Sequence, residues 1–242
     1  MIHIVVLLLV GLMSSSRAFA QETLTFTTEA YPPFSYRDDT GTNRGAGVDQ
    51  VTTIMADVDS PFRIEIMPWA RAIALAETQP MHCVFAAART PEREKRFKWV
   101  LPLFVDRAIL VTRQGSGLAS LDIEAAKGRL VGTHRADYTE VLLKEMGFSS
   151  VDVSADFGTT VRKLVEGRIE LMPMSESVFL EMLAQGTPLE QGVTLSTQPL
   201  GFACNLGVPD ALITQMQAAL DALISTGGQD RILASYGVAR PR

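Results

Sequence analysis

Residues 85–104 read FAAARTPEREKRFKWVLPLF, in which the end of an apolar strand meets a small-residue turn and then a charged segment. Thr90 can cap a helix, Pro91 suits a first helical position, and Glu92 favours a first turn. The stretch therefore predicts a strand that leads into a helix N-terminus. Ligands bind at such strand ends in open α/β sheets, because backbone N–H groups there are unpaired and the helix end is positive.

Arg93 lies in the first turn of this expected helix. Its guanidinium is a planar fork of donors that matches a carboxylate, so Arg93 is a candidate for binding an anionic group. A surface ion pair with Glu92 or Glu94 is the alternative interpretation. The spacing alone does not choose between the two.

The order of the motifs resembles the amino-acid-type periplasmic solute-binding proteins, which are the bacterial extracellular solute-binding family 3. Thr-Pro-Glu-Arg at 90–93 and the run at 99–104 are similar to the family's T-x-x-R and F-S-x-P-Y. The resemblance spans nearly the whole chain after residue 20. It implies an α/β fold of the two-lobed periplasmic-binding-protein type (type II), with a hinge and a cleft between the lobes.

Strand and helix signals alternate along the chain, which independently favours α/β lobes with largely parallel sheets. The resemblance implies that the chain crosses between the lobes near residues 105–112 and 195–208, and these crossings would form the hinge. We expect lobe I to contain residues 21–106 and 207–242, and lobe II to contain residues 107–206 with the hinge strands. A cleft between such lobes can close around a solute.

Residues 1–20 contain an apolar run and end in Ala-Phe-Ala, which predicts a secretory signal peptide cleaved before Gln21 and a periplasmic protein. The apolar run, residues 4–13, is too short to span a bilayer. Because no Lys or Arg precedes the run, an N-terminal anchor is the alternative.

The chain has 22 Lys and Arg residues against 27 Asp and Glu residues, a formal net charge of −5. This mildly acidic and unpatterned charge argues against nucleic acid or an anionic membrane as a partner.

Cys83 and Cys204 lie in apolar, strand-like segments. They could pair in an oxidising compartment, but two cysteines are no disulfide framework, and we expect two buried thiols. Neither has a CxxC or nearby histidine partner, so we expect no metal site and no cofactor.

The resemblance implies where the first lobe would bind a ligand. Arg93 would hold a carboxylate, while Tyr31, after the strand at 24–28, and Trp69, at a helix start, would form the walls of a slot. A plain core role for Trp69 is the rival interpretation. Ala86 and Ala88 occupy the turn where the family usually has small hydroxyl residues, so hydrogen bonds to the ligand there must come from the backbone.

In the second lobe, the segment from Gly132 is similar to the family's G-T-x-x-x-x-Y. Thr133 and the N–H groups after it would receive an anion, and His134 and Arg135 would strengthen that anion site. Ser175 occupies the place where amino-acid binders have an aspartate that holds the ammonium group, and Glu176 follows it. Recognition of an α-amino group would then require Glu176 to turn inward.

The function expected from the resemblance is a periplasmic receptor for a small polar solute with a carboxylate, an amino acid or an organic acid. Its partners would be this solute and an ABC permease of the inner membrane, and we expect a monomer that is not an enzyme. One alternative is a dehydratase-like enzyme of the same fold, with Glu29, His134 and Glu176 as candidate acid–base groups. The other is a sensor or accessory protein that presents the ligand to a partner.

Overall fold

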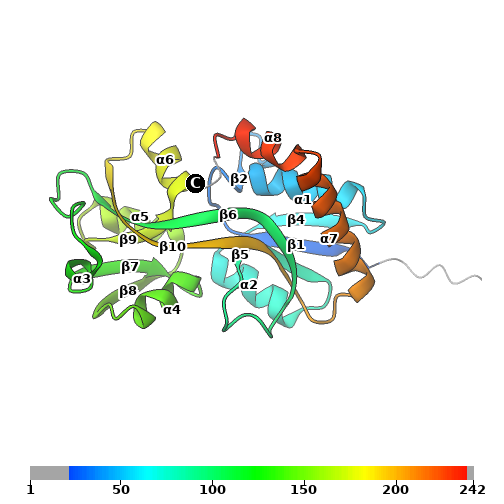
Figure 1. Ribbon diagram of the computed structural model, residues 1–242, viewed down its shortest axis with the longest axis horizontal. Coiled ribbons are helices and arrows are strands. Elements are labelled where there is room, and N and C mark those ends of the chain that lie inside the picture. Colours follow the sequence, from blue (N-terminus) through cyan, green and yellow to red (C-terminus); the bar gives the residue numbers. More distant parts are fainter. Residues whose placement is uncertain (1–21, 239–242) are drawn as a thin grey trace, which may run out of the picture.

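The computed structural model describes residues 22–238, which form two α/β halves joined by two long strands (Figure 1). These strands, β6 (Lys98–Arg113) and β10 (Leu189–Cys204), pair antiparallel over almost their whole length. They contain the two crossings that the sequence predicts. The expected signal peptide, residues 1–20, lies outside the described residues, and the lobe boundaries stay a prediction.

The first half lies at the right of Figure 1 and is built on the large sheet, whose strand order is β4-β1-β5-β10-β6-β9. Its strands are β1 (Leu24–Thr28), β4 (Phe62–Ile66), β5 (His82–Ala88) and the hairpin β2 (Tyr36–Arg37) and β3 (Asn43–Arg44). Its helices are α1 (Ala46–Ala56), α2 (Trp69–Thr78), α7 (Asp210–Ser225) and α8 (Gly228–Ser235).

The second half contains a parallel pair of strands, β7 and β8, beside β9. Its elements are α3 (Ile123–Ala126), β7 (Leu130–His134), α4 (Tyr138–Glu145), β8 (Ser150–Ser154), α5 (Phe157–Val165), β9 (Met172–Ser175) and α6 (Glu176–Ala184). Aspartates cap three of its helices: the side chains of Asp122, Asp137 and Asp156 accept from the N–H groups of Ala125, Thr139 and Thr159.

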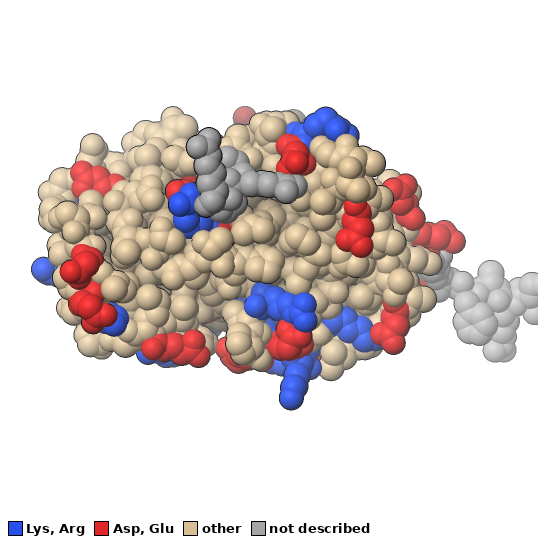
Figure 2. All heavy atoms as spheres, viewed as in Figure 1, with Lys and Arg blue, Asp and Glu red and all other residues tan. Residues whose placement is uncertain are grey.

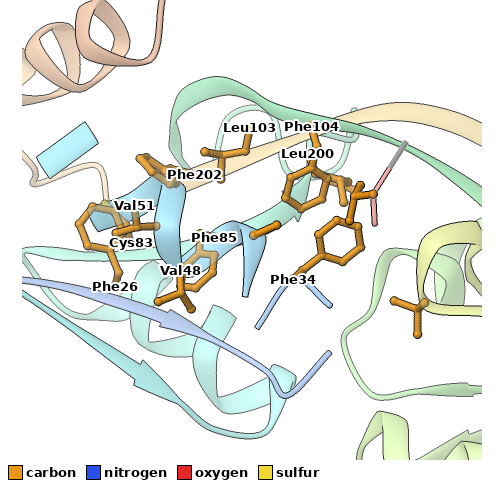
Figure 3. Packing of buried hydrophobic residues seen from close by; sticks show 14 of the residues in the cluster. Phe26, Phe34, Val48, Val51, Cys83, Phe85, Leu103, Phe104, Leu200 and Phe202 are labelled. Carbon is orange, nitrogen blue, oxygen red and sulfur yellow. The ribbon is translucent and has the colours of Figure 1, made fainter. Parts of the chain in front are cut away.

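Aromatic side chains fill the core of the first half (Figure 3). Phe26 is fully buried between Phe202, at 5.0 Å between ring centroids, and Phe62, at 6.4 Å. Phe34 stacks on Phe104 at 4.3 Å between ring centroids. This contact fixes the loop that follows β1 against β6.

Cys83 and Cys204 form a disulfide, so the expectation of two buried thiols is wrong. The two residues are separated by 121 positions in the sequence, but they are direct register partners in the antiparallel pair β5–β10. Strand pairing brings the sulfur atoms together. A count of cysteines cannot show this, because it contains no information about which strands are neighbours.

Residues 91–96 do not form the helix that the sequence predicts. The N–H groups of Arg93 and Glu94 both donate to the carbonyl of Thr90, and the segment continues as tight turns. Strand β6 begins at Lys98, so too few residues remain for a helix to propagate. Arg93 is therefore held by a compact turn at the end of β5.

Gly132 lies inside β7 and not in a turn. A Cβ atom there would lie 2.2 Å from Cδ1 of Ile169, so close packing within the second half requires a glycine. None of the helices between residues 22 and 238 combines the length and the apolar character that a bilayer crossing requires.

Candidate functional site

Arg93 lies at the contact between the two halves, where its side chain bridges them. Only 4% of the residue is exposed, and Nη2 donates to the carbonyl of Ala136 in the second half at 2.7 Å. Nη1 donates to the carbonyl of Ala88 at 3.3 Å, and the guanidinium carbon lies 5.8 Å from the centroid of the Trp69 ring. We call the contact between the halves the seam; it is formed by Tyr31, Trp69 and Arg93 from the first half and His134, Ala136 and Ser175 from the second.

The alternative of a surface ion pair for Arg93 is wrong. Glu94 pairs with Arg89 at 2.5 Å and Glu92 pairs with Arg96 at 3.2 Å, and no carboxylate between residues 22 and 238 forms an ion pair with Arg93. Burial lowers the pKa of Arg93, and the charge of Asp137 opposes this only in part. The hydrogen-bond partners of this buried cation are therefore neutral carbonyls.

Trp69 has a buried core position and also contacts the second half, and its role as a wall of the ligand slot stays a prediction. Its ring is buried in a small apolar cluster with Ala72, Ile73 and Phe97, and its Nε1 donates to the carbonyl of Ala136 at 2.9 Å. Ala136 thus accepts from both Trp69 and Arg93. Its backbone has φ of 62°, a left-handed conformation that costs a non-glycine residue about 1–3 kcal/mol and is frequent at ligand sites.

Tyr31 reaches the seam from the loop after β1. Its hydroxyl accepts from the N–H of Ser175 at 2.8 Å, and its ring meets Phe157 edge to face at 4.6 Å between centroids. Burial is the main cause that raises the pKa of Tyr31 well above its usual value, and the charge of Asp106 adds to this effect. The hydroxyl is therefore neutral. Tyr31 and Trp69 therefore both contact the second half.

His134 also spans the seam, through a contact that the sequence did not predict. Its Nε2 lies 3.2 Å from Oε1 of Glu29, and both side chains are largely buried. Burial alone would lower the pKa of His134, but Glu29 and Asp137 outweigh burial and raise the pKa to about 9. For Glu29 burial dominates and raises its pKa, with His134 opposing. His134 is therefore protonated and positively charged at neutral pH.

The expected anion site around Thr133 is not assembled in this structure. The hydroxyl of Thr133 is bonded to that of Thr139 at 2.6 Å, and the side chain of Arg135 is exposed. The N–H of Arg135 donates to the carbonyl of Ser154, and that of Ala136 donates to Glu140. The left-handed turn at Ala136 directs its carbonyl, and not its N–H, towards Arg93.

Ser175 lies at the end of β9, where its hydroxyl donates to Oδ1 of Asp106 at 2.5 Å. Glu176 does not turn towards the first half, because it pairs with Arg107 at 2.7 Å. The sequence reasoning did not single out Asp106. An acid within the apolar strand of residues 98–113 was the signal that could have found it, since such a strand seldom buries a carboxylate without a role.

Ala86 and Ala88 lie at the end of β5, where the strand backbone is irregular. The register between β5 and β10 shifts by one residue beside Ala86, which has φ of 62°, so β5 carries a bulge there. The carbonyl of Ala88 accepts from Arg93. The expectation that hydrogen bonds to the ligand at this turn come from the backbone stays a prediction.

Cavities lie on two sides of the seam. The larger, of about 600 Å³, has walls from both halves, among them Glu29, Pro68, Phe157 and Gly158. The smaller, of about 180 Å³, lies between the turn at 89–92 and helix α4, with Tyr138 and Gln198 in its wall. Within residues 22–238, no group of three or more His, Cys, Asp or Glu side chains is placed to hold a metal ion.

The family model of the bacterial extracellular solute-binding proteins, family 3, matches residues 24–239. The chain belongs to this family. The match covers both halves and both crossing strands. The α/β periplasmic-binding-protein fold is shown by similar solved structures.

Three relatives of this family 3 protein illustrate the range of similar chains. The Escherichia coli (strain K12) protein named "Putative ABC transporter arginine-binding protein 2" is 25% identical over 80% of each chain. An ancestral arginine-binding protein, solved with glutamine bound, is 24% identical with a TM-score of 0.79 over 88% of this chain and 97% of that one. A histidine kinase sensor domain is 18% identical, with a TM-score of 0.82 over 91% and 99%.

Proposed function

We propose that the protein is a periplasmic receptor that closes lobe I (21–106 and 207–242) on lobe II (107–206) around a small solute that carries a carboxylate. The observation that carries this proposal is Arg93, a buried cation at the seam whose hydrogen-bond partners are the neutral carbonyls of Ala88 and Ala136. A charged site that the protein leaves uncompensated favours an anionic ligand group.

A solute carboxylate would replace the carbonyl of Ala136 as the partner of Arg93. Hydrogen bonds between two charged groups are roughly twice as strong as neutral ones, and a carboxylate can accept two from one guanidinium. The solute would then lie between the walls given by Tyr31 and Trp69, with Ala86 and Ala88 contributing backbone groups. Binding to both halves is what drives such closure, because a ligand shifts an equilibrium only through its different affinity for the two states.

The relatives support an amino acid as the solute and an ABC permease as the partner. The Escherichia coli relative is named for arginine and for an ABC transporter, and the ancestral arginine-binding protein has been solved with glutamine. In the second lobe, Thr133, His134 and Arg135 would complete the anion site after closure, and Thr133 and His134 would first have to exchange their present partners within the protein.

Binding without turnover fits the three groups that were candidates for catalysis. Glu29 pairs with His134 across the seam, and Glu176 pairs with Arg107 beside it. Each is engaged in an ion pair in place of being poised as a general acid or base. The likeness to a histidine kinase sensor domain favours one second candidate, a receptor whose ligand-bound form is read by a signalling partner.

Calorimetry on the purified protein tests this proposal. A thermal-shift screen of the twenty L-amino acids and small organic acids identifies the ligand, since a molecule that binds only the folded state raises the melting temperature. With that ligand, Arg93→Ala is expected to lower the binding free energy by about 2–5 kcal/mol, because the ligand carboxylate loses a desolvated partner. Arg71→Ala, which alters an exposed arginine of α2, is the matched control and should bind normally.

Two outcomes would contradict different parts of the proposal. Affinity that survives Arg93→Ala would remove Arg93 from the site but leave a receptor. If neither an amino acid nor an organic acid binds the wild-type protein, the receptor proposal itself is wrong.

A further inference from the structure

Two polar side chains on the crossing strand β10, those of Ser196 and Gln198, hold buried atoms that have no hydrogen-bond partner. Between residues 22 and 238, three buried side-chain nitrogen or oxygen atoms lack a partner, and Oγ of Ser196 and Nε2 of Gln198 are two of them. The third, Nε of Arg107, lies on the other crossing strand, β6. Buried polar atoms in folded proteins nearly always have a partner. The exceptions in this part of the chain are therefore confined to the two strands that join the halves.

Ser196 and Gln198 lie where the two halves approach each other. Both line the smaller cavity, between the turn at 89–92 of the first half and helix α4 of the second. In the antiparallel ladder Ser196 is opposite Ala108 and Gln198 is opposite Asp106. Two residues that are two positions apart point to the same face of a strand. The two polar side chains therefore share the face of β10 that lies between the halves.

Tyr138, at the start of α4, is the polar side chain of the second half that lies beside them. Burial raises the pKa of Tyr138, and Ser196 and Gln198 act against this rise, which places both of them near its hydroxyl. Even so, Oγ of Ser196 and Nε2 of Gln198 form no hydrogen bond of regular geometry, and both atoms are shielded from solvent. Helix α4 thus covers the two polar atoms without pairing with them.

This arrangement of the halves carries a cost that a more open one avoids. An unpaired buried polar atom disfavours the state that buries it by roughly 5- to 150-fold, because the atom loses its water and gains no partner. Moving α4 away from the turn at 89–92 would remove one wall around Ser196 and Gln198 and let water reach both side chains. The cost is therefore present when the halves are together and absent when they are apart.

We propose that Ser196 and Gln198 favour the open form of the ligand-free protein, because closure leaves their polar atoms unpaired, and that this cost limits the affinity for the solute. The inference rests on the proposed function, in which the halves close around a solute. The apparent affinity of such a receptor equals the affinity of its closed form reduced by the fraction of protein that is closed. Removing either polar atom should raise that fraction, and so tighten binding without any new contact to the solute.

Small-angle X-ray scattering of the ligand-free protein tests this inference. We expect the wild type to have a larger radius of gyration than the arrangement in Figure 1, and both Ser196→Ala and Gln198→Met to be more compact than the wild type. Ser196→Ala removes a hydroxyl and adds no apolar bulk, so a new hydrophobic contact cannot cause its compaction. Ser225→Ala, at an exposed position of α7, is the matched control and should keep the wild-type value.

Calorimetry with L-arginine and L-glutamine measures the effect on binding. For either amino acid that the wild type binds, Ser196→Ala and Gln198→Met should each bind at least about fivefold more tightly, with Ser225→Ala unchanged. Neither hinge variant should melt at a lower temperature than the wild type, because neither loses a hydrogen bond. Compaction of both variants without tighter binding would overturn the claim that the cost limits affinity.

The outcomes separate this inference from the receptor proposal. If the ligand-free wild type is as compact as the arrangement in Figure 1, or if both variants are as extended as the wild type, the inference is overturned. A lower melting temperature or a loss of folding in both variants would show that the two atoms have partners, and would overturn it as well. The receptor proposal is decided by the ligand screen, whereas scattering of the ligand-free protein requires no ligand.

Discussion

The aromatic core of the first half and the seam are both buried, but they bury opposite kinds of chemistry. In the core, Phe26 and Phe202 lie next to the Cys83–Cys204 disulfide, and every one of these side chains is fully enclosed (Figure 3). At the seam, the buried side chains include the charged groups of Arg93 and Asp106, which have neutral partners. Burial by itself therefore does not show whether a region holds the fold together.

The difference lies in what each region would gain by opening. Opening the core exposes apolar surface to water, which costs roughly 25 cal/mol per Å² and is not offset by any new interaction. Opening the seam lets buried charges regain water and then a ligand, which offsets the contacts that are lost. The outer surface differs from both, because acidic and basic side chains are interspersed on the face shown in Figure 2. We therefore expect the core to stay closed, whereas under the proposed function the seam would exchange its internal partners for those of a ligand.

A core truncation should produce the largest loss of stability. Phe26→Ala removes a fully buried ring between Phe62 and Phe202 and is expected to lower the free energy of unfolding by about 3–5 kcal/mol. Trp69→Phe, which removes the seam hydrogen bond to Ala136 and part of a buried ring, should cost less, about 2 kcal/mol. Chemical denaturation of both variants measures this. Equal losses would break the distinction between core and seam.

Loss of the disulfide should have the next largest effect. Replacing both Cys83 and Cys204 by alanine is expected to lower the free energy of unfolding by about 2–4 kcal/mol, because the crosslink closes a long loop in the unfolded chain. Ligand affinity of the folded variant should not change, since the bond lies in the core. A melting temperature that a reducing agent leaves unaltered, together with two titratable thiols in the native protein, would contradict this pairing.

The smallest expected effect is a pH dependence of the seam. The pKa of His134 is raised to about 9 in the folded protein, so its contribution to stability is fully present below pH 6.5 and is lost as the pH rises through about 9. Burial disfavours the charged form of Glu29 in the same pair. We therefore expect the free energy of unfolding to fall by only about 1 kcal/mol over this pH range. Unfolding experiments between pH 7 and 10 measure the loss, and His134→Gln should show a flatter profile. Stability that rises over this range in the wild type alone would show that the pair does not stabilise the seam.

Local patterns were enough to predict most of the architecture. Alternating strand and helix signals predicted α/β halves, and the resemblance to the family predicted crossings near residues 105–112 and 195–208, which lie within β6 and β10. Such signals depend on residues that are close in the chain. The order of motifs in turn predicted the family, which the match over residues 24–239 confirms.

The sequence by itself determined most of the secondary structure, the fold class and the presence of an arginine at a strand end, but not that residues 91–96 form turns in place of a helix. Only the tertiary structure decided that Cys83 joins Cys204, that Arg93 meets Ala136, and that a carboxylate on β6 lies beside Ser175. Each of these pairs joins residues that are at least 43 positions apart. Their contacts depend on strand register and on the meeting of the two halves, and no local propensity encodes either of these.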